Sequence, residues 1–332
     1  MRYGYGLILC CALFILIPAI PASPEAANIN PGAEAQDEES IDYIHQTPKN
    51  LPGFEPSDDQ APLNQILTAA GKNVSRLFAD LLNISAVENV LLQKLNREGE
   101  VRSSLKFKCL YLGIATTEKW GPSFIEYRSD AKGREITPPG SREGYMLTSG
   151  FISAPLIFHP AHQKGSSFRL LGRQKLGSRD TLLVGYAQIP AQSRLFGTYR
   201  LRQNTGTIFK QGMAWIDAET YQIVRVVSDL LEPLPLIRLE KQRTEIEFDE
   251  VQLNRASRKF WLPKQAIVTL QWEGKILRNT HLYSDFELFS VETMQKIAKP
   301  EVEEKETEES ADPAPEAKPL AGAPKQPDPP EK

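Results

Sequence analysis

Few residues of this 332-residue chain have the types and spacing that chemistry requires. His281, Tyr283 and Asp285 alternate along the sequence, so a strand would place them on one face, where a carboxylate could orient a histidine base. Alternating polar residues are also typical of any strand with a face in water. A hydrolase that uses His281 and Asp285 is therefore kept only as a minor alternative.

Other chemical motifs are sparse. His159 and His162 form a close histidine pair, but Pro160 breaks a helix there and no acid or cysteine lies nearby to complete a metal site. Cys109 lies on the apolar side of an alternating run, which predicts a buried, unreactive thiol. The nucleophile elbow, phosphate loop, dinucleotide fingerprint and zinc-protease motif are absent. The sequence predicts no enzyme, no catalytic residue, no metal and no cofactor.

Charge is distributed unevenly along the chain. Residues 61–299 carry 33 basic and 23 acidic side chains, whereas 23–60 and 300–332 are acidic. Within residues 151–211, nine basic side chains accompany one acid, Asp180. Such a surface attracts polyanions, lipid headgroups or the chain's own acidic ends, but without interleaved aromatic residues it does not suit nucleic acid. The predicted anion-binding residues are Arg169, Arg173, Lys175, Arg200 and Arg202.

An irregular apolar segment, residues 145–158, is interrupted by Gly150 and Pro155. It cannot be left in water, so it must fill or cover something. A core-packing loop or short helix and a lid over a ligand are both compatible with this composition. The residues predicted to contact an apolar ligand are Phe151, Leu156 and Phe158 of this segment, with Trp215 and Trp272 from predicted strands.

The first 22 residues have the order of a secretory signal peptide, with Arg2, an apolar stretch and then small residues around Ala22. The alternative is an uncleaved anchor, but the apolar stretch is shorter than the roughly 20 residues that a spanning helix needs. The sequence thus predicts an exported protein, either periplasmic or secreted. Residues 23–60 and 300–332 are rich in proline and acids and poor in apolar side chains, which predicts a disordered linker and a disordered tail.

The remaining residues, 61–299, are predicted to form a single β-rich domain. Residues 63–81 carry one apolar stripe at helical spacing, and after Asn83 the apolar period changes to two. Alternating runs separated by short turns predict an antiparallel meander, with a last short helix at 294–299. One helix cannot cover both sides of a large sheet. We therefore expect a mainly β (α+β) fold, a curved antiparallel sheet or half-barrel with the N-terminal amphipathic helix packed in its concave side.

A resemblance to known proteins can be stated at residues 214–225, where a Trp-Ile-Asp turn precedes a strand that bears Arg225. This hairpin resembles that of the periplasmic lipoprotein-localisation (LolA-like) and anti-sigma-regulator half-barrels. The chain also resembles a group of uncharacterised exported bacterial proteins through the segments 119–122, 147–151, 260–263 and 281–286. The half-barrel resemblance implies a cavity for acyl chains or lipoproteins.

The sequence therefore favours an exported, non-enzymatic binding protein that holds an apolar or lipid-like ligand in a half-barrel cavity. The main alternative is an envelope scaffold or sensor that binds a protein partner and whose cavity is filled by residues 145–158. The ligand, the protein partner and the oligomeric state are not specified by the sequence.

Overall fold

The structure is a computed structural model that describes residues 42–49, 51–81, 83–130, 132–136, 144–201, 203–254 and 256–288. The predicted signal peptide, the tail at 300–332 and the short helix at 294–299 lie outside these ranges and stay predictions.

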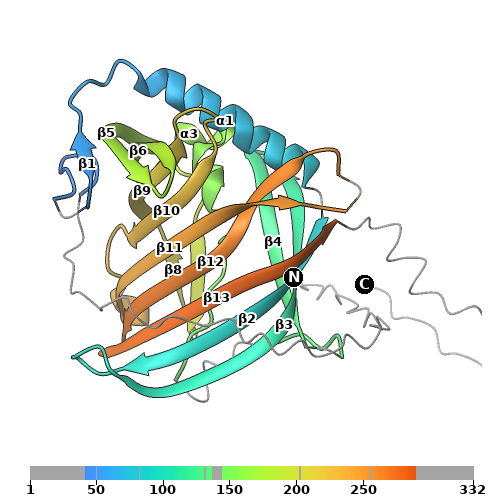
Figure 1. Cartoon of the computed structure of the whole chain (residues 1–332). Coiled ribbons are helices and arrows are strands. Elements are labelled where there is room, and N and C mark those ends of the chain that lie inside the picture. The colour runs from blue at the N-terminus through green and yellow to red at the C-terminus, as the bar shows by residue number, and fades with distance from the viewer. Residues whose placement is uncertain are drawn as a thin grey trace, which may run out of the picture. The chain divides into compact units, whose positions relative to one another are not determined.

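Within the described ranges most residues lie in strands (Figure 1). The long helix is α1 (Leu63–Asp80), and α3 (Pro160–Gln163) and the 3-10 turns η1 (Ala154–Phe158) and η2 (Pro235–Ile237) are short. The strands are β1 (Phe54–Pro56), β2 (Asn83–Leu95), β3 (Val101–Glu118), β4 (Gly121–Ser129), β5 (Ser166–Leu176), β6 (Arg179–Gln188), β7 (Gly197–Leu201), β8 (Asn204–Ile208), β9 (Lys210–Asp217), β10 (Ile223–Leu230), β11 (Leu239–Gln252), β12 (Lys259–Trp272) and β13 (Lys275–Leu288).

Eleven of these strands form one sheet in the order β1-β5-β6-β9-β10-β11-β12-β13-β2-β3-β4, and β7 and β8 form a separate hairpin. Every pairing in the large sheet is antiparallel. Its two edges are β1 and β4, so the sheet does not close into a barrel. The prediction of a mainly β fold built on a large antiparallel sheet is confirmed.

Both faces of the large sheet carry apolar clusters, since successive side chains of a strand point to opposite faces. Ala266, Val268 and Leu270 of β12 belong to the main core cluster, which we call the inner cluster. The outer cluster contains Leu183 and Trp215 from neighbouring strands. The sheet is therefore covered by chain on both sides along β6 and β9.

The helix α1 owes its form to the apolar stripe seen in the sequence. Its buried residues follow helical spacing: Ile66, Ala70, Gly71, Val74 and Phe78. The four buried side chains other than Gly71 belong to the inner cluster. Figure 1 shows α1 lying across one end of the strands rather than along them. No helix in the described ranges is long and apolar enough to cross a membrane.

Part of the predicted linker is folded, so the disorder prediction is wrong for residues 42–49 and 51–60. The side chain of Tyr43 is fully buried in the outer cluster, and β1 pairs with β5. Gly172 of β5 permits this pairing: its φ is +150°, and a Cβ there would lie 2.1 Å from the carbonyl oxygen of Glu55. This segment has low overall hydrophobicity, so the few aromatic side chains that anchor it were not recognised in the sequence.

Candidate functional site

A cavity of about 380 Å³ opens between the edge strand β4, the turn η1 and the strands β6, β8 and β9. Apolar and polar side chains contribute nearly equally to its walls. The apolar lining includes Phe124, Ile157, Leu195, Phe196 and Ile208, and the polar lining includes Glu126, Gln188, Lys210 and Ser228. A concave site with apolar walls and few convergent polar groups is typical of small-molecule binding.

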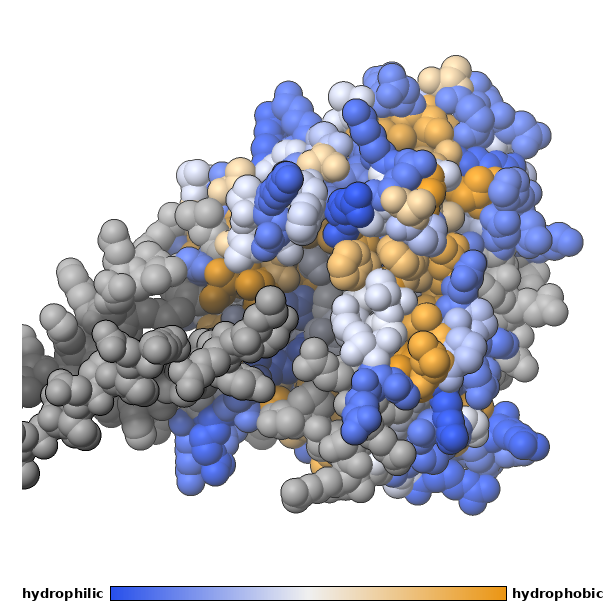
Figure 2. Space-filling view, turned by 180° about the vertical axis from the view of Figure 1, so that it is seen from behind, coloured by the Kyte–Doolittle hydropathy of each residue, from blue (hydrophilic) through white to orange (hydrophobic). Residues whose placement is uncertain are grey.

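Two lining residues of this cavity also reach the surface. Ile125 is 42% exposed and Phe196 is 55% exposed, although both are large apolar side chains. On the face seen in Figure 2, apolar surface is interspersed among hydrophilic side chains. The cavity is therefore bordered in part by exposed apolar side chains.

Lys210 is the cationic residue of the cavity lining. It begins β9, where its backbone N–H donates to Gln188 Oε1 at 2.6 Å. Its ammonium group has no hydrogen-bond or ion-pair partner among the described residues, and burial lowers the pKa of Lys210. The nearby Glu126 charge opposes this pKa shift but does not cancel it.

Glu126 faces the cavity from β4. Its two carboxylate oxygens accept the backbone N–H of Gly150 at 3.1 and 3.0 Å, which fixes the carboxylate against the segment that covers the sheet. Burial raises the pKa of Glu126, while the charge of Arg128 and the Gly150 N–H act in the opposite direction. The cavity thus contains one acidic and one basic group whose pKa values are shifted toward each other.

Residues 145–158, which we call the plug, are packed as core in the structure. Phe151, Leu156 and Phe158 all belong to the inner cluster, and none is more than 2% exposed. The ring of Phe158 lies 5.4 Å from that of Phe168 and 5.9 Å from that of Tyr186. The cavity of about 380 Å³ is the space left beside the plug.

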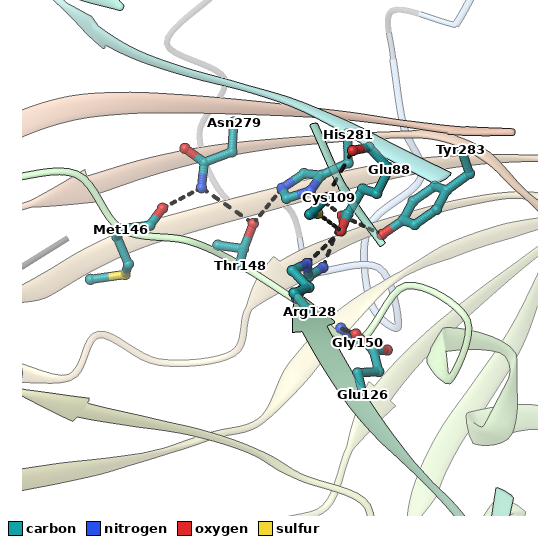
Figure 3. A network of polar contacts seen from close by, with 10 residues as sticks. All are labelled: Glu88, Cys109, Glu126, Arg128, Met146, Thr148, Gly150, Asn279, His281 and Tyr283. Atoms are coloured by element: carbon teal, nitrogen blue, oxygen red, sulfur yellow. Dashed lines mark hydrogen bonds and ion pairs between the residues drawn. The ribbon is translucent and has the colours of Figure 1, made fainter. Parts of the chain in front are cut away.

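A buried polar cluster lies beneath the plug, centred on Glu88 of β2 (Figure 3). Glu88 is fully buried and accepts hydrogen bonds from four side chains. Arg128 donates twice, from Nε at 2.5 Å and from Nη2 at 2.9 Å, and His281 Nδ1 lies at 2.7 Å. The Tyr283 hydroxyl donates at 2.8 Å and the Cys109 thiol at 3.3 Å. Strands β2, β3, β4 and β13 are thereby joined through one carboxylate.

Burial opposes the charged form of Glu88, but the hydrogen bonds from His281 and Arg128 outweigh it, so the pKa of Glu88 lies well below its usual range. Burial lowers the pKa of His281 and outweighs the opposing effect of Glu88, which favours the neutral ring. The prediction of a buried Cys109 is confirmed. Burial also raises the pKa of this thiol to about 12, which disfavours the reactive thiolate. In this cluster Glu88 is therefore held in its charged form and His281 in its neutral form.

A chain of hydrogen bonds ties the start of the plug to this cluster. Asn279 Nδ2 lies 2.5 Å from the carbonyl oxygen of Met146 and 3.3 Å from Thr148 Oγ1. Thr148 Oγ1 is in turn 3.2 Å from His281 Nε2. With a neutral His281 that donates from Nδ1 to Glu88, the Thr148 hydroxyl donates to Nε2 and every contact has one donor and one acceptor. The cluster thus positions the plug (Figure 3).

The hydrolase alternative paired His281 with the wrong carboxylate. A register shift lies between Ser284 and Glu287, and Asp285 has a φ of 53°, so the alternation of β13 is broken there. Asp285 is exposed and accepts from the Ser284 hydroxyl at 3.0 Å. The carboxylate beside His281 is Glu88, and neither group is accessible to a substrate. The pairing of His281 with Asp285 is not formed.

Of the predicted ligand-contacting residues, four belong to one cluster. Trp272 lies in the inner cluster together with Phe151, Leu156 and Phe158. Trp215 is placed differently, in the outer cluster, where its Nε1 donates to Gln174 Oε1 at 2.6 Å. Trp215 therefore lies on the opposite face of the sheet from the other four. None of the five residues lines the cavity beside the plug, so their contact with a ligand stays a prediction.

The predicted anion-binding residues do not share one face. Residues paired across a sheet point to the same face. Arg173 is paired with Leu182 of the inner cluster, whereas Arg169 contacts Ile44 and Thr47 beside the outer cluster. Lys175 is exposed and is paired with Asp180. Arg202 and the side chain of Arg200 lie outside the described part of the chain, so binding by these residues stays a prediction.

The histidine pair is used structurally. His159 Nδ1 accepts the backbone N–H of Ala161 at 3.2 Å, and His162 Nε2 lies 2.9 Å from the carbonyl oxygen of Pro122. The first contact caps α3 at its N-terminus, and the second fixes α3 against the edge of β4. No group of three metal-ligating side chains is found in the described ranges.

A second cavity of about 320 Å³ lies on the other side of Tyr283 and is lined by Asp249, Glu250, Lys264 and Asp285 among others. Lys264 is already close to Asp249, at 3.6 Å. The lysine of this cavity is therefore already paired with an acid, whereas Lys210 in the first cavity has no hydrogen bond or ion pair from its ammonium group to a described residue. We therefore regard the cavity beside the plug as the candidate site.

No protein-family model matches the sequence, and neither does any curated protein. Solved structures do show similarity. A LolA superfamily protein from Nitrosomonas europaea is 10% identical over 71% of this chain and 97% of that chain, with a TM-score of 0.37. An outer membrane lipoprotein-sorting protein domain from Vibrio parahaemolyticus is 12% identical over 71% of this chain and 99% of that chain, with a TM-score of 0.39.

A DUF1329 family protein from Desulfovibrio piger is also similar, at 13% identity over 69% of this chain and 94% of that chain, with a TM-score of 0.36. The predicted resemblance to LolA-like proteins is confirmed at the level of these structural neighbours. Likeness at such identities and TM-scores concerns the fold and carries no functional argument. Function has to be inferred from the side chains of this chain.

Proposed function

We propose that this chain is an exported, non-enzymatic binding protein that holds an apolar or lipid-like ligand in the cavity beside the plug. The observation that carries the proposal is the cavity itself, about 380 Å³ in volume, whose lining combines apolar side chains, two of them exposed, with a few charged and polar groups. A volume of this size is within the range of small-molecule sites. In this proposal α1 and the plug together cover the concave side of the curved sheet, and they leave the ligand space at its β4 edge.

We also propose that the protein is not an enzyme. The buried acid and histidine that resemble a catalytic pair, Glu88 and His281, are both fully buried and have their hydrogen bonds satisfied within the protein. The cavity itself presents Glu126 and Lys210, which suit binding of a polar headgroup. A carrier or sensor needs only such non-covalent contacts with its ligand.

The proposal is tested by filling the cavity. Ala154 lines it at the first residue of η1, so Ala154→Phe should occupy ligand space and raise the dissociation constant of a fluorescent apolar probe by about tenfold or more. The measurement is a fluorescence titration of the full mature chain, with thermal unfolding to show that the variant is folded.

A matched control inserts the same ring in the second cavity. Val251 lines that cavity, so Val251→Phe should leave probe binding unchanged. Equal binding by wild type and a folded Ala154→Phe variant would contradict the proposed site. Absence of probe binding to the wild type would contradict the proposed function.

A second candidate function has its own supporting observation. The plug is fully packed, and Phe158 has no exposed surface, so a large part of the concave side is already filled by the chain. An envelope scaffold or sensor that binds a protein partner would need no ligand space at all. A stable protein partner recovered from the native envelope, with no lipid in the complex, would favour this function.

Export is proposed from the leader at residues 1–22. We expect the mature chain to begin between about Ser23 and Asn28, because a signal peptidase cuts after small residues that follow the apolar stretch. N-terminal sequencing of the protein from its native source measures this. A chain that keeps Met1 and is recovered in the membrane fraction would refute it.

A further inference from the structure

The cavity beside the plug contains the ammonium group of Lys210, which forms no hydrogen bond or ion pair with a described residue, although the charge of Glu126 acts on it. Of the polar groups that line it, Gln188 donates to Ser193 and Leu195 and accepts from the Lys210 backbone, and Glu126 accepts from Gly150. Ser153 donates to the carbonyl oxygen of Gly150. The Lys210 ammonium is different, because no hydrogen bond or ion pair to a described residue satisfies it.

An ammonium group in a partly buried, apolar site has a cost that a ligand can remove. Taking a charge out of water is unfavourable unless an opposite charge or hydrogen-bond acceptors replace the water. Phe124, Ile208 and Phe196 line the same cavity, so apolar side chains as well as polar groups surround Lys210. An anionic group that enters the cavity would restore the missing interactions of Lys210.

We propose that the ligand is a single-chain amphiphile with a singly charged anionic headgroup, which pairs with Lys210 while its chain lies along the apolar side chains of the lining. This inference rests on the proposed ligand-binding function and adds the class of ligand. The cavity volume of about 380 Å³ suits one chain rather than several. The exposed apolar side chains of Ile125 and Phe196 allow part of the chain to extend outward.

Glu126 limits the charge of the headgroup. Its carboxylate lies near enough to Lys210 to influence the ammonium, so a bound anion is close to a negative charge as well as to a positive one. One negative charge on the ligand is balanced by Lys210. A second negative charge on the ligand would be repelled by Glu126. The cavity lining contains no further lysine or arginine to compensate that repulsion.

The test compares three probes that share a twelve-carbon chain and differ in the headgroup: dodecanoate, dodecanol and dodecyl phosphate. Binding to the full mature chain is measured by calorimetry below the micelle concentration at about pH 8, where the phosphate carries close to two charges. We expect dodecanoate to bind most tightly. Lys210→Met should weaken dodecanoate about tenfold and leave dodecanol unchanged, since a hydrogen bond to a charged group is lost.

Three further variants keep the result interpretable. Lys210→Arg retains the charge and should retain the preference for dodecanoate, which separates charge from any folding defect of Lys210→Met. Glu126→Gln should improve dodecyl phosphate more than dodecanoate. Lys264→Met removes a lysine from the second cavity and should change none of the three affinities.

Other outcomes overturn the proposal in distinguishable ways. If dodecanol binds as tightly as dodecanoate and Lys210→Met changes neither, the headgroup inference is wrong and the ligand-binding function stands. If Glu126→Gln does not favour dodecyl phosphate, the charge limit is wrong. If the wild type binds none of the three probes, both the inference and the proposed function are wrong.

Discussion

Replacing Glu88 by glutamine should destabilise the fold by roughly 3–5 kcal/mol, because Arg128 would be left as an uncompensated buried charge. Glu88 and Arg128 are both buried and form two hydrogen bonds to each other. Glu88→Gln keeps the size of the side chain, so the loss is electrostatic rather than a loss of packing. Urea unfolding of the full mature chain, followed by circular dichroism, measures the change.

The control uses an ion pair of the same type at the surface. Arg225 Nη2 lies 2.8 Å from Glu245 Oε2, and both side chains are partly exposed. Glu245→Gln should therefore cost no more than about 1 kcal/mol. A Glu88→Gln variant as stable as Glu245→Gln would show that the buried cluster does not support the fold.

The same carboxylate should make stability depend on pH. The pKa of Glu88 is lowered in the folded state, so its contribution is complete above the unfolded-state pKa of about 4.3 and is lost as the pH falls below that value. The difference in unfolding free energy between wild type and Glu88→Gln should thus shrink from neutral pH to about pH 3. A difference that stays constant would contradict the assigned ionisation.

Replacing Phe158 by alanine should cost roughly 3–5 kcal/mol, the usual effect of removing a buried aromatic ring. The ring is fully buried and packs against Phe168 and Tyr186. Leu77 of α1, by contrast, is only partly buried, so Leu77→Ala should cost about 2 kcal/mol or less. The sequence alone had left open the reverse order, with a loosely held lid and a tightly packed helix.

Unfolding of both variants, with probe binding measured in parallel, decides between lid and core. A Phe158→Ala variant that is less destabilised than Leu77→Ala but takes up more apolar probe would show that the plug moves as a lid. If Phe158→Ala is the more destabilised variant and probe binding changes little, the plug is core. The ligand space is then confined to the cavity at β4.

Much of the sheet could be predicted from the period of its apolar residues. Strands β11, β12 and β13 have one buried and one wet face, and the predicted runs fall within a few residues of the observed bounds. Strand β4 was missed because its pattern is inverted. Its inward positions carry Glu126 and Arg128, while Ile125 and Tyr127 are exposed. Apolar alternation is not informative where the buried partners are polar.

The face of β9 could not be assigned for a different reason. Met213, Ala214, Trp215 and Ile216 are all buried, so alternation gives no contrast between the two sides. The prediction placed Trp215 toward the ligand, whereas Tyr43 from the supposed linker covers it on the outer side. A buried strand with two apolar faces requires a second covering layer, and that layer was not foreseen.

The site residues were mostly missed because their partners are far away in sequence. Glu88 lies at an inward position between Ala86 and Val90, and an acid in an apolar face is a signal that could have been noticed. Its partners Arg128 and His281 are 40 and 193 residues away, and no local pattern links them. Lys210 has no such signal, since its role depends on the cavity around it.

The order of the strands has a consequence for how the molecule is made. Strand β13, the last strand in the described residues, pairs with β12 on one side and with β2, the first long strand described, on the other. Until β13 is available, β2 and β12 each present an unpaired edge, and such edges attract strands of other chains. Pairing between the two ends of the chain is also slow, because a long loop must close before any contact forms. A sheet that lacks β13 therefore exposes two strand edges to other chains, and pairing of β13 covers both.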